Sequence, residues 1–138
     1  MLHSFLLRDS VAFRVDMPVS VQAGQPVPVV LRLTNKTERP LVVALRGRPI
    51  AFDVTVARPD GAVVWRRLEG KVVSVIPAVR TLEPAESLTF EAAWDGRAAD
   101  GAVVLPGQYL VTGTLPTDRP EGLVTRPAAL EVLPPPSR

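Results

Sequence analysis

Two aspartates, Asp95 and Asp100, and a lysine–serine pair, Lys71 and Ser74, are the residues here whose types and spacing could support chemistry. Neighbouring carboxylates can share a proton or bind a cation, and a lysine can activate a serine hydroxyl as a nucleophile. Calcium, however, takes about six to eight oxygen ligands, and no further Asp, Asn or Glu lies between the two aspartates. The residues around Lys71 and Ser74 are predicted to form a strand, which would point these side chains to opposite faces. Neither arrangement predicts a catalytic or metal site.

Other catalytic groups are scarce. The sequence has no cysteine, and its single histidine, His3, lies beside the first residue. These two facts argue against disulfides, thiolate chemistry, a Ser-His-Asp triad and a zinc site built from several imidazoles. We therefore predict a protein that is not an enzyme and that uses neither a metal nor a cofactor.

The charge pattern argues against a nucleic-acid partner. The formal net charge is only +2, and all basic residues except Lys36 and Lys71 are arginines, spread along the chain. Nucleic-acid-binding domains usually carry a basic stripe with interleaved aromatic residues, whereas aromatic residues make up only 5% of this chain. We expect no nucleic-acid partner.

Apolar and polar residues alternate through most of the chain, which is typical of strands with one buried face. The residues on the expected buried faces are Val11, Phe13, Val15, Val27, Val29, Leu31, Leu33, Leu41, Val43, Leu45, Ile50, Phe52, Val54, Val56, Leu88, Phe90, Ala92, Trp94, Tyr109, Val111, Gly113, Leu115, Leu130 and Val132. Turn residues separate these segments, and Pro59-Asp60-Gly61 predicts a tight hairpin. The pattern predicts an all-β protein, an immunoglobulin-like antiparallel β-sandwich of about seven to nine strands.

The same alternation indicates a structural role for the segment from Asp95 to Asp100. It places Trp94 in the core and Asp95 at the end of a strand, where an Asp side chain accepts a hydrogen bond from its own backbone and starts a turn. Asp100-Gly101 has the same turn chemistry. Tyr109, two residues after Pro-Gly, is expected to enter the next strand with its hydroxyl bonded to nearby backbone.

The chain length predicts a single sandwich over residues 11–133, preceded by a loosely ordered segment, 1–10, and followed by a proline-rich tail, 134–138. No apolar run reaches the length of about 18 residues that a membrane helix needs. The first residues lack the basic region of a signal peptide. We expect a cytoplasmic protein, not bound to a membrane, that is a monomer or a weak oligomer.

Four motifs occur in a characteristic order: VVLRLTNKTERPLVV, FDVTVARPDGAVVWRR, LEPAESLTFEAAWD and LPGQYLVTGTL. In this order and spacing the sequence resembles the BsuPI-type intracellular proteinase inhibitors of bacteria, from about residue 19 to residue 133. The resemblance covers framework positions such as Asn35, Trp65, Trp94 and Tyr109. It implies an immunoglobulin-like sandwich and inhibition of an intracellular serine proteinase of the subtilisin type.

The sequence departs from the family pattern after Pro84, where Ala85 replaces the usual glycine. This turn is therefore expected to avoid a positive φ or to change type. After Trp65, the sequence Arg66-Arg67-Leu68 lacks the second aromatic position that the resemblance leads us to expect. Both departures concern loops.

An inhibitor without catalytic groups has to bind its target through loops. Counting antiparallel strands places loops 35–39, 59–61, 77–86 and 116–126 at one end, and loops 22–25, 47–49 and 95–105 at the other. Prolines at the ends and centre of loop 116–126 restrict its backbone, which lowers the entropy lost on binding. Its Arg119 and Leu123 are the candidate contact residues, with Arg80 as a further choice and Asn35 in the neighbouring loop.

Two other interpretations stay open. The chain is alternatively a non-inhibitory immunoglobulin-like module for protein–protein interaction, in which loop 116–126 is only a solvated connection. Carbohydrate binding would require an exposed aromatic platform, but Trp65 and Trp94 both alternate with the expected core residues.

Overall fold

The computed structural model describes residues 9–136, which form β-strands joined by turns and irregular segments. The strands are β1 (Val11–Asp16), β2 (Ser20–Gln22), β3 (Val27–Asn35), β4 (Leu41–Arg46), β5 (Asp53–Ala57), β6 (Val63–Arg66), β7 (Pro77–Leu82), β8 (Ser87–Trp94), β9 (Gly107–Leu115), β10 (Leu123–Val124) and β11 (Ala128–Leu133). Within this described range, no helix has the length and apolarity to cross a membrane. Expectations for residues 1–8 and 137–138 lie outside the described residues.

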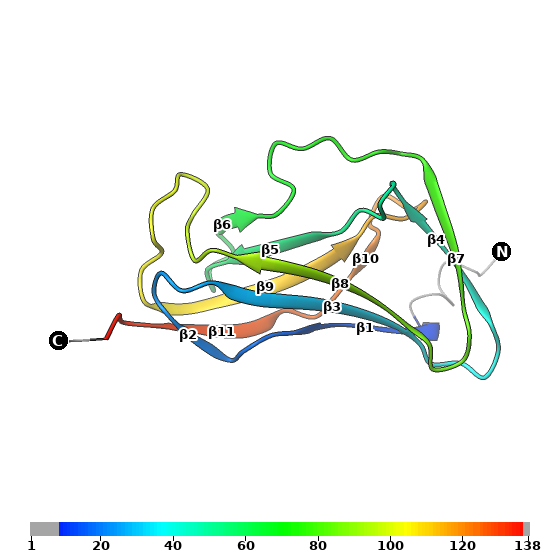
Figure 1. The fold of residues 1–138 in the computed structure, drawn as a ribbon, viewed down its shortest axis with the longest axis horizontal. Helices are drawn as coiled ribbons and strands as arrows, with labels where there is room; N and C mark the ends of the chain where they lie inside the picture. Colours follow the sequence, from blue (N-terminus) through cyan, green and yellow to red (C-terminus); the bar gives the residue numbers. More distant parts are fainter. Residues whose placement is uncertain (1–8, 137–138) are drawn as a thin grey trace.

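Two sheets lie one over the other (Figure 1). One has the strand order β1-β3-β8, and the other has the order β2-β11-β9-β5-β6, with β10 beside β9. All pairings in them are antiparallel except that of β2 with β11. Because the chain crosses repeatedly between the two sheets, the arrangement is that of an immunoglobulin-like sandwich, as predicted.

Aromatic side chains from both sheets meet in the core. The ring centroids of Trp94 on β8 and Tyr109 on β9 lie 6.3 Å apart, and those of Phe90 on β8 and Phe52, next to β5, lie 5.4 Å apart. Trp94 is fully buried, as alternation predicts. Some predicted core positions near the sandwich edges, such as Phe13, are only partly buried.

Gly113 fixes how closely the sheets approach. A methyl group at Gly113 on β9 would collide with the side chain of Leu31 on β3, in the opposite sheet. Leu31 is fully buried, so its side chain occupies the space that a larger residue at position 113 would need. Gly113 is thus the contact point between the central strands of the two layers.

Strands β4 and β7 form a separate two-stranded sheet, which lies at one end of the sandwich in Figure 1. We call this end, where β3 finishes, the Asn35 end, and the opposite end, where β8 finishes, the Trp94 end. Residues 77–82, predicted as part of a loop, are strand β7. Three short or irregular strands that alternation did not reveal, β2, β7 and β10, raise the strand number above the predicted range.

Strand counting assigned two turns to the wrong ends. β9 starts at the Trp94 end and pairs antiparallel with β5, with Ala57 opposite Leu110, so turn 59–61 lies at the Trp94 end. Turn 47–49 lies at the Asn35 end, because Leu45, just before it, forms a bridge with Thr117, which follows β9 at that end. The reason is that β4 pairs with β7 at one end and does not traverse the sandwich. The strand expected around Lys71 and Ser74 is also wrong, because residues 71–76 are irregular.

Candidate functional site

The acidic segment at the Trp94 end is a pair of turns. Asp95 Oδ1 accepts from Arg97 N–H (3.0 Å), and Asp100 Oδ1 accepts from Ala102 N–H (2.9 Å). Among the described residues, no group of three or more His, Cys, Asp or Glu side chains is placed to hold a metal ion. Both aspartates therefore shape the connection between β8 and β9.

Tyr109 anchors the start of β9. Its hydroxyl donates a hydrogen bond of 2.6 Å to Leu105 O, four residues earlier in the chain. This is the corner geometry that immunoglobulin-like sandwiches use at the corresponding strand, and it confirms the predicted role of Tyr109. The indole N–H of Trp94 likewise donates to Arg97 O (2.8 Å), which holds the same connection against the core.

At the Asn35 end, the first half of loop 116–126 is held in shape by hydrogen bonds between residues of the same loop. Thr117 is buried, and its hydroxyl oxygen accepts from Arg119 N–H (3.0 Å). Gly122 N–H donates to Arg119 O (3.1 Å). Arg119 is therefore an exposed residue on a backbone held by hydrogen bonds on both sides.

Arg46 connects this loop to the β4–β7 sheet. Its Nε donates to Thr117 O (3.2 Å) and its Nη1 donates to Val75 O (2.8 Å). Between Arg46, residues 73–75 and residues 116–120 lies a shallow hollow of about 400 Å³. No local sequence pattern indicates this arrangement, because Arg46, Val75 and Thr117 are far apart in the chain.

Leu123 is a core residue. It is 5% exposed and pairs with Leu115 in the β10–β9 ladder. This burial prevents Leu123 from projecting into a pocket of a proteinase, which is the contact that the prediction assigned to it. The second half of loop 116–126 returns to the sheet, whereas the sequence interpretation treated the whole segment as projecting.

Asn35 is also buried, with no exposed surface. Its amide nitrogen donates to Arg39 O (2.8 Å) and Leu82 O (2.9 Å), and its Oδ1 accepts from Thr37 N–H (2.8 Å) and the Thr37 hydroxyl (2.7 Å). As a direct contact residue Asn35 is excluded by this burial. It instead sets the shape of loop 35–39 and ties that loop to the end of β7.

Arg80 is exposed on β7, where its Nη1 donates to the neighbouring Val79 O (3.0 Å). Within the part of the chain that the structure describes, strand β7 pairs only with β4. Of the four predicted contact residues, the structure thus leaves Arg80 and Arg119 at the surface.

The turn that follows β7 keeps the shape that a glycine would favour. Ala85 has a φ of 67°, and Glu86 N–H donates to Glu83 O (2.9 Å) across the turn. Proline at the second position and a positive φ at the third define a type II turn. The expectation that Ala85 avoids a positive φ is therefore wrong.

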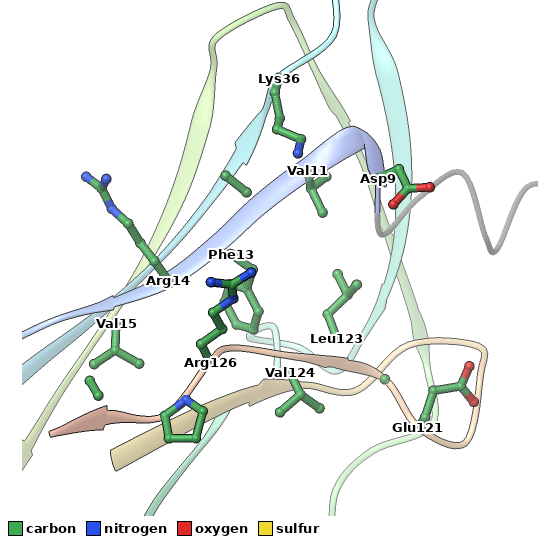
Figure 2. Close-up of a pocket in the computed structure, with 14 residues that line it drawn as sticks. Asp9, Val11, Phe13, Arg14, Val15, Lys36, Glu121, Leu123, Val124 and Arg126 are labelled. Atoms are coloured by element: carbon green, nitrogen blue, oxygen red, sulfur yellow. The ribbon is translucent and has the colours of Figure 1, made fainter. Parts of the chain in front are cut away.

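A larger groove, of about 830 Å³, lies beside loop 116–126, between β1 and residues 121–128 (Figure 2). Apolar side chains of Val11, Phe13, Leu123 and Val124 lie along it. Sequence reasoning missed this groove, since it depends on how two distant edge strands lie in space.

The chain is similar to one protein family and, at low identity, to several solved structures. The BsuPI family, described as intracellular proteinase inhibitor, matches residues 14–120, and no curated protein matches the chain. Among solved structures, the CARDB domain of a Pyrococcus furiosus protein is similar over 89% of this chain and 92% of its own, with 12% identity and a TM-score of 0.47. An alkylpurine DNA glycosylase of Pseudomonas fluorescens is similar over 96% of this chain and 36% of its own, with 12% identity and a TM-score of 0.48.

The family match covers most of the chain, including strands β3 to β9 and the loop residue Arg119. It agrees with the motif order, with the buried Trp94 and with the Tyr109 corner. The chain belongs to the BsuPI family of intracellular proteinase inhibitors.

Proposed function

We propose that this protein inhibits a serine proteinase of the subtilisin type, in the cytoplasm, by binding it through the Asn35 end of the sandwich. The binding surface consists of residues 116–120, the β4–β7 sheet and residues 71–76. Family membership supports a proteinase as the partner. The single structural observation that carries the choice of surface is the braced loop with Arg119 exposed on it.

Exposed apolar side chains beside this loop support the same surface. Val72 is 97% exposed and Val75 is 75% exposed, in the segment whose carbonyl accepts from Arg46. Val42 and Val79 are exposed on the outward face of the β4–β7 sheet, where residue 42 lies opposite Thr81 and residue 79 opposite Ala44. The buried centres of protein interfaces are rich in apolar residues and arginine.

The bracing matters because a substrate-like loop loses less entropy on binding when its backbone is already fixed. Arg119 is the residue that we propose to enter a pocket of the proteinase, and Arg80 is proposed as a flanking contact. Typical inhibitor interfaces bury about 800 Å² on each partner. Loop 116–120 therefore requires the neighbouring valines to complete the contact.

The test is titration of a panel of subtilisin-type proteinases with the intact protein. We expect inhibition by the native chain and at least about a tenfold weaker inhibition by Arg119→Ala, which corresponds to about 1.4 kcal/mol. The matched control is Arg58→Ala, an exposed arginine in the turn at the Trp94 end. Equal inhibition by the Arg119 and Arg58 variants, with both still folded, would remove the proposed surface, and no inhibition of any proteinase by the native chain would remove the function.

A non-inhibitory interaction module is the second candidate. It is favoured by the burial of Leu123 and Asn35, which removes half of the predicted contacts, while the exposed valines would suit any protein partner. Binding of a proteinase without loss of its activity, measured in the same panel, would support this alternative.

A further inference from the structure

The groove in Figure 2 is bounded on both sides by strand edges. Among residues 9–136, β1 pairs only with β3 and β10 pairs only with β9. The two open edges face each other across the groove and belong to different sheets. A sheet edge presents unpaired N–H and C=O groups and is a template for an added strand.

On the β1 side, the hydrogen-bond pattern shows which residues face the groove. Lys36 N–H donates to Ser10 O (3.0 Å), and the register continues as Ala12 opposite Thr34 and Arg14 opposite Arg32. Because hydrogen-bonded pairs alternate along an antiparallel ladder, Ala12 and Arg14 direct their backbone groups to β3. Those of Val11, Phe13 and Val15 point the other way, into the groove.

On the opposite wall of the groove, formed by β10, the hydrogen bonds also show which backbone groups face the groove. Thr125 N–H donates to Gly113 O (2.9 Å), and Leu123 lies opposite Leu115. Leu123 and Thr125 therefore face β9, and the backbone groups of Val124 between them face away from it. Both walls of the groove thus carry open backbone donors and acceptors.

The two walls also run in the same direction. β1 begins at the Asn35 end, where Val11 lies opposite Asn35. β10 and β11 also run away from that end, because they pair antiparallel with β9, which finishes there at Leu115. One extended segment running toward the Asn35 end would consequently be antiparallel to both walls, which is the more stable pairing per residue.

Charged side chains divide the groove into two halves, as Figure 2 shows. Asp9 and Glu121 lie toward the Asn35 end, with Lys36 above them, whereas Arg126 and Arg14, which forms an ion pair with Asp16 (3.4 Å), lie farther along β1. Between these groups, the lining is largely apolar. An occupant is therefore favoured if it is acidic where it meets the arginines, apolar in the middle and basic where it meets Asp9 and Glu121.

We propose that this groove binds an extended segment of a partner protein as an added strand. The segment runs antiparallel to β1 and to β10, with an acidic residue near its N-terminal end, alternating apolar residues in its middle and a basic residue near its C-terminal end. Main-chain hydrogen bonds supply affinity and the side chains supply selectivity, as in other cases of strand addition. This site goes beyond the proposed inhibition and does not depend on it.

The probe is a capped peptide, Glu-Val-Thr-Val-Thr-Val-Lys, added to the intact isotope-labelled protein and followed by NMR. We expect the largest amide shifts at Val11, Phe13, Val15 and Val124. A peptide with the order of charges reversed should bind about fivefold more weakly, since two favourable charge pairs become repulsive. A peptide N-methylated at alternate residues should bind at least about tenfold more weakly, because it loses backbone hydrogen bonds.

The matched variants are Arg126→Glu in the groove and Arg58→Glu at the Trp94 end; both arginines are exposed. The groove variant should lower affinity for the original peptide about fivefold, whereas Arg58→Glu should leave it unchanged. The proposal is overturned if shifts map elsewhere or are absent. It is also overturned if the N-methylated peptide binds equally well, or if the β1 amides change only with protein concentration, which would indicate pairing with a second copy.

Discussion

The side-chain amide of Asn35 donates a hydrogen bond of 2.9 Å to the backbone oxygen of Leu82, 47 positions later in the chain. This bond joins the end of β3 to the end of β7 and thereby attaches the β4–β7 sheet to the sandwich. The same amide also donates to Arg39 O, and its oxygen accepts from Thr37 N–H. A single buried residue thus organises the Asn35 end.

Asn35→Ala should therefore be strongly destabilising. It removes these bonds and leaves at least one buried carbonyl and one N–H without a partner, at a cost of about 1–3 kcal/mol for each buried group. We expect the free energy of unfolding to fall by about 2–4 kcal/mol in urea denaturation. The control Thr37→Ala removes only a loop hydroxyl and should cost about 1 kcal/mol or less.

Replacing Ala85 by glycine should stabilise the protein. An L-residue in the left-handed region costs about 1–2 kcal/mol, and Ala85 lies there with a φ of 67°. Glycine relieves this cost but adds about 0.4–1 kcal/mol of chain entropy to the unfolded state. The net expected gain is about 0.5–1 kcal/mol in thermal or urea unfolding.

The matched control is Ala62→Gly, at an exposed turn position where φ is not positive. There only the entropy term remains, so the variant should be slightly less stable than the native chain. Equal loss of stability in the Ala85 and Ala62 variants would contradict the strain argument.

Removing the charge of Asp53 is expected to lower the stability of the protein. Its carboxylate is nearly buried and accepts from Arg66 Nη2 (2.9 Å), Leu68 N–H (3.0 Å) and Val54 N–H (2.9 Å). The hydrogen bond and the charge of Asp53 raise the pKa of Arg66 above its usual value, so Arg66 keeps its positive charge throughout the ordinary pH range.

Asp53→Asn should cost about 1–3 kcal/mol, because the amide NH₂ then faces another donor, while the exposure of Arg66 keeps the loss below that of a fully buried pair. Arg66 is more exposed, so Arg66→Lys, which keeps the charge but loses the planar fork, should cost less. The ranking of the two variants in urea denaturation is the measurement. A smaller loss for Asp53→Asn than for Arg66→Lys would show that the carboxylate is not the organising group.

The two tryptophans should differ in fluorescence. Trp94 is fully buried, whereas Trp65 is partly exposed, with ring centroids 6.2 Å apart. We expect the Trp65→Phe variant to emit at short wavelength and to resist quenching by iodide, because only Trp94 remains. Strong quenching of that variant would mean that Trp94 is exposed to solvent and that the core is packed differently.

The buried faces of the long strands could be predicted from sequence, because alternation depends only on local pattern. β3 and β9 show it most clearly, with buried residues at every second position. β7 could not be recognised in the same way: its burial pattern is irregular, since it is an edge strand over one end of the core. Turns 47–49 and 59–61 were assigned to the wrong ends because β4 pairs with β7 at one end and does not traverse the sandwich.

The candidate contact residues show the same limit. Arg119 and Arg80 are exposed as predicted from their positions in polar segments, but Leu123 and Asn35 are buried by contacts with distant strands. Leu123 is covered because residues 123–124 return to pair with β9. A loop read from its prolines and charges does not show where it rejoins a sheet.

The contact between Gly113 and Leu31 has a mechanical consequence. The side chain of Leu31 fills the space beside Gly113, where the facing layer has no side chain. If one layer moved along the other by one residue, about 3.3 Å, the Leu31 side chain would have to leave this space. Sliding of one layer over the other is therefore opposed at this contact. Gly113 O accepts from Thr125 N–H (2.9 Å), and Gly113 N–H donates to Thr125 Oγ1 (3.0 Å). A displacement of segment 116–126 therefore acts directly on the contact between Gly113 and Leu31.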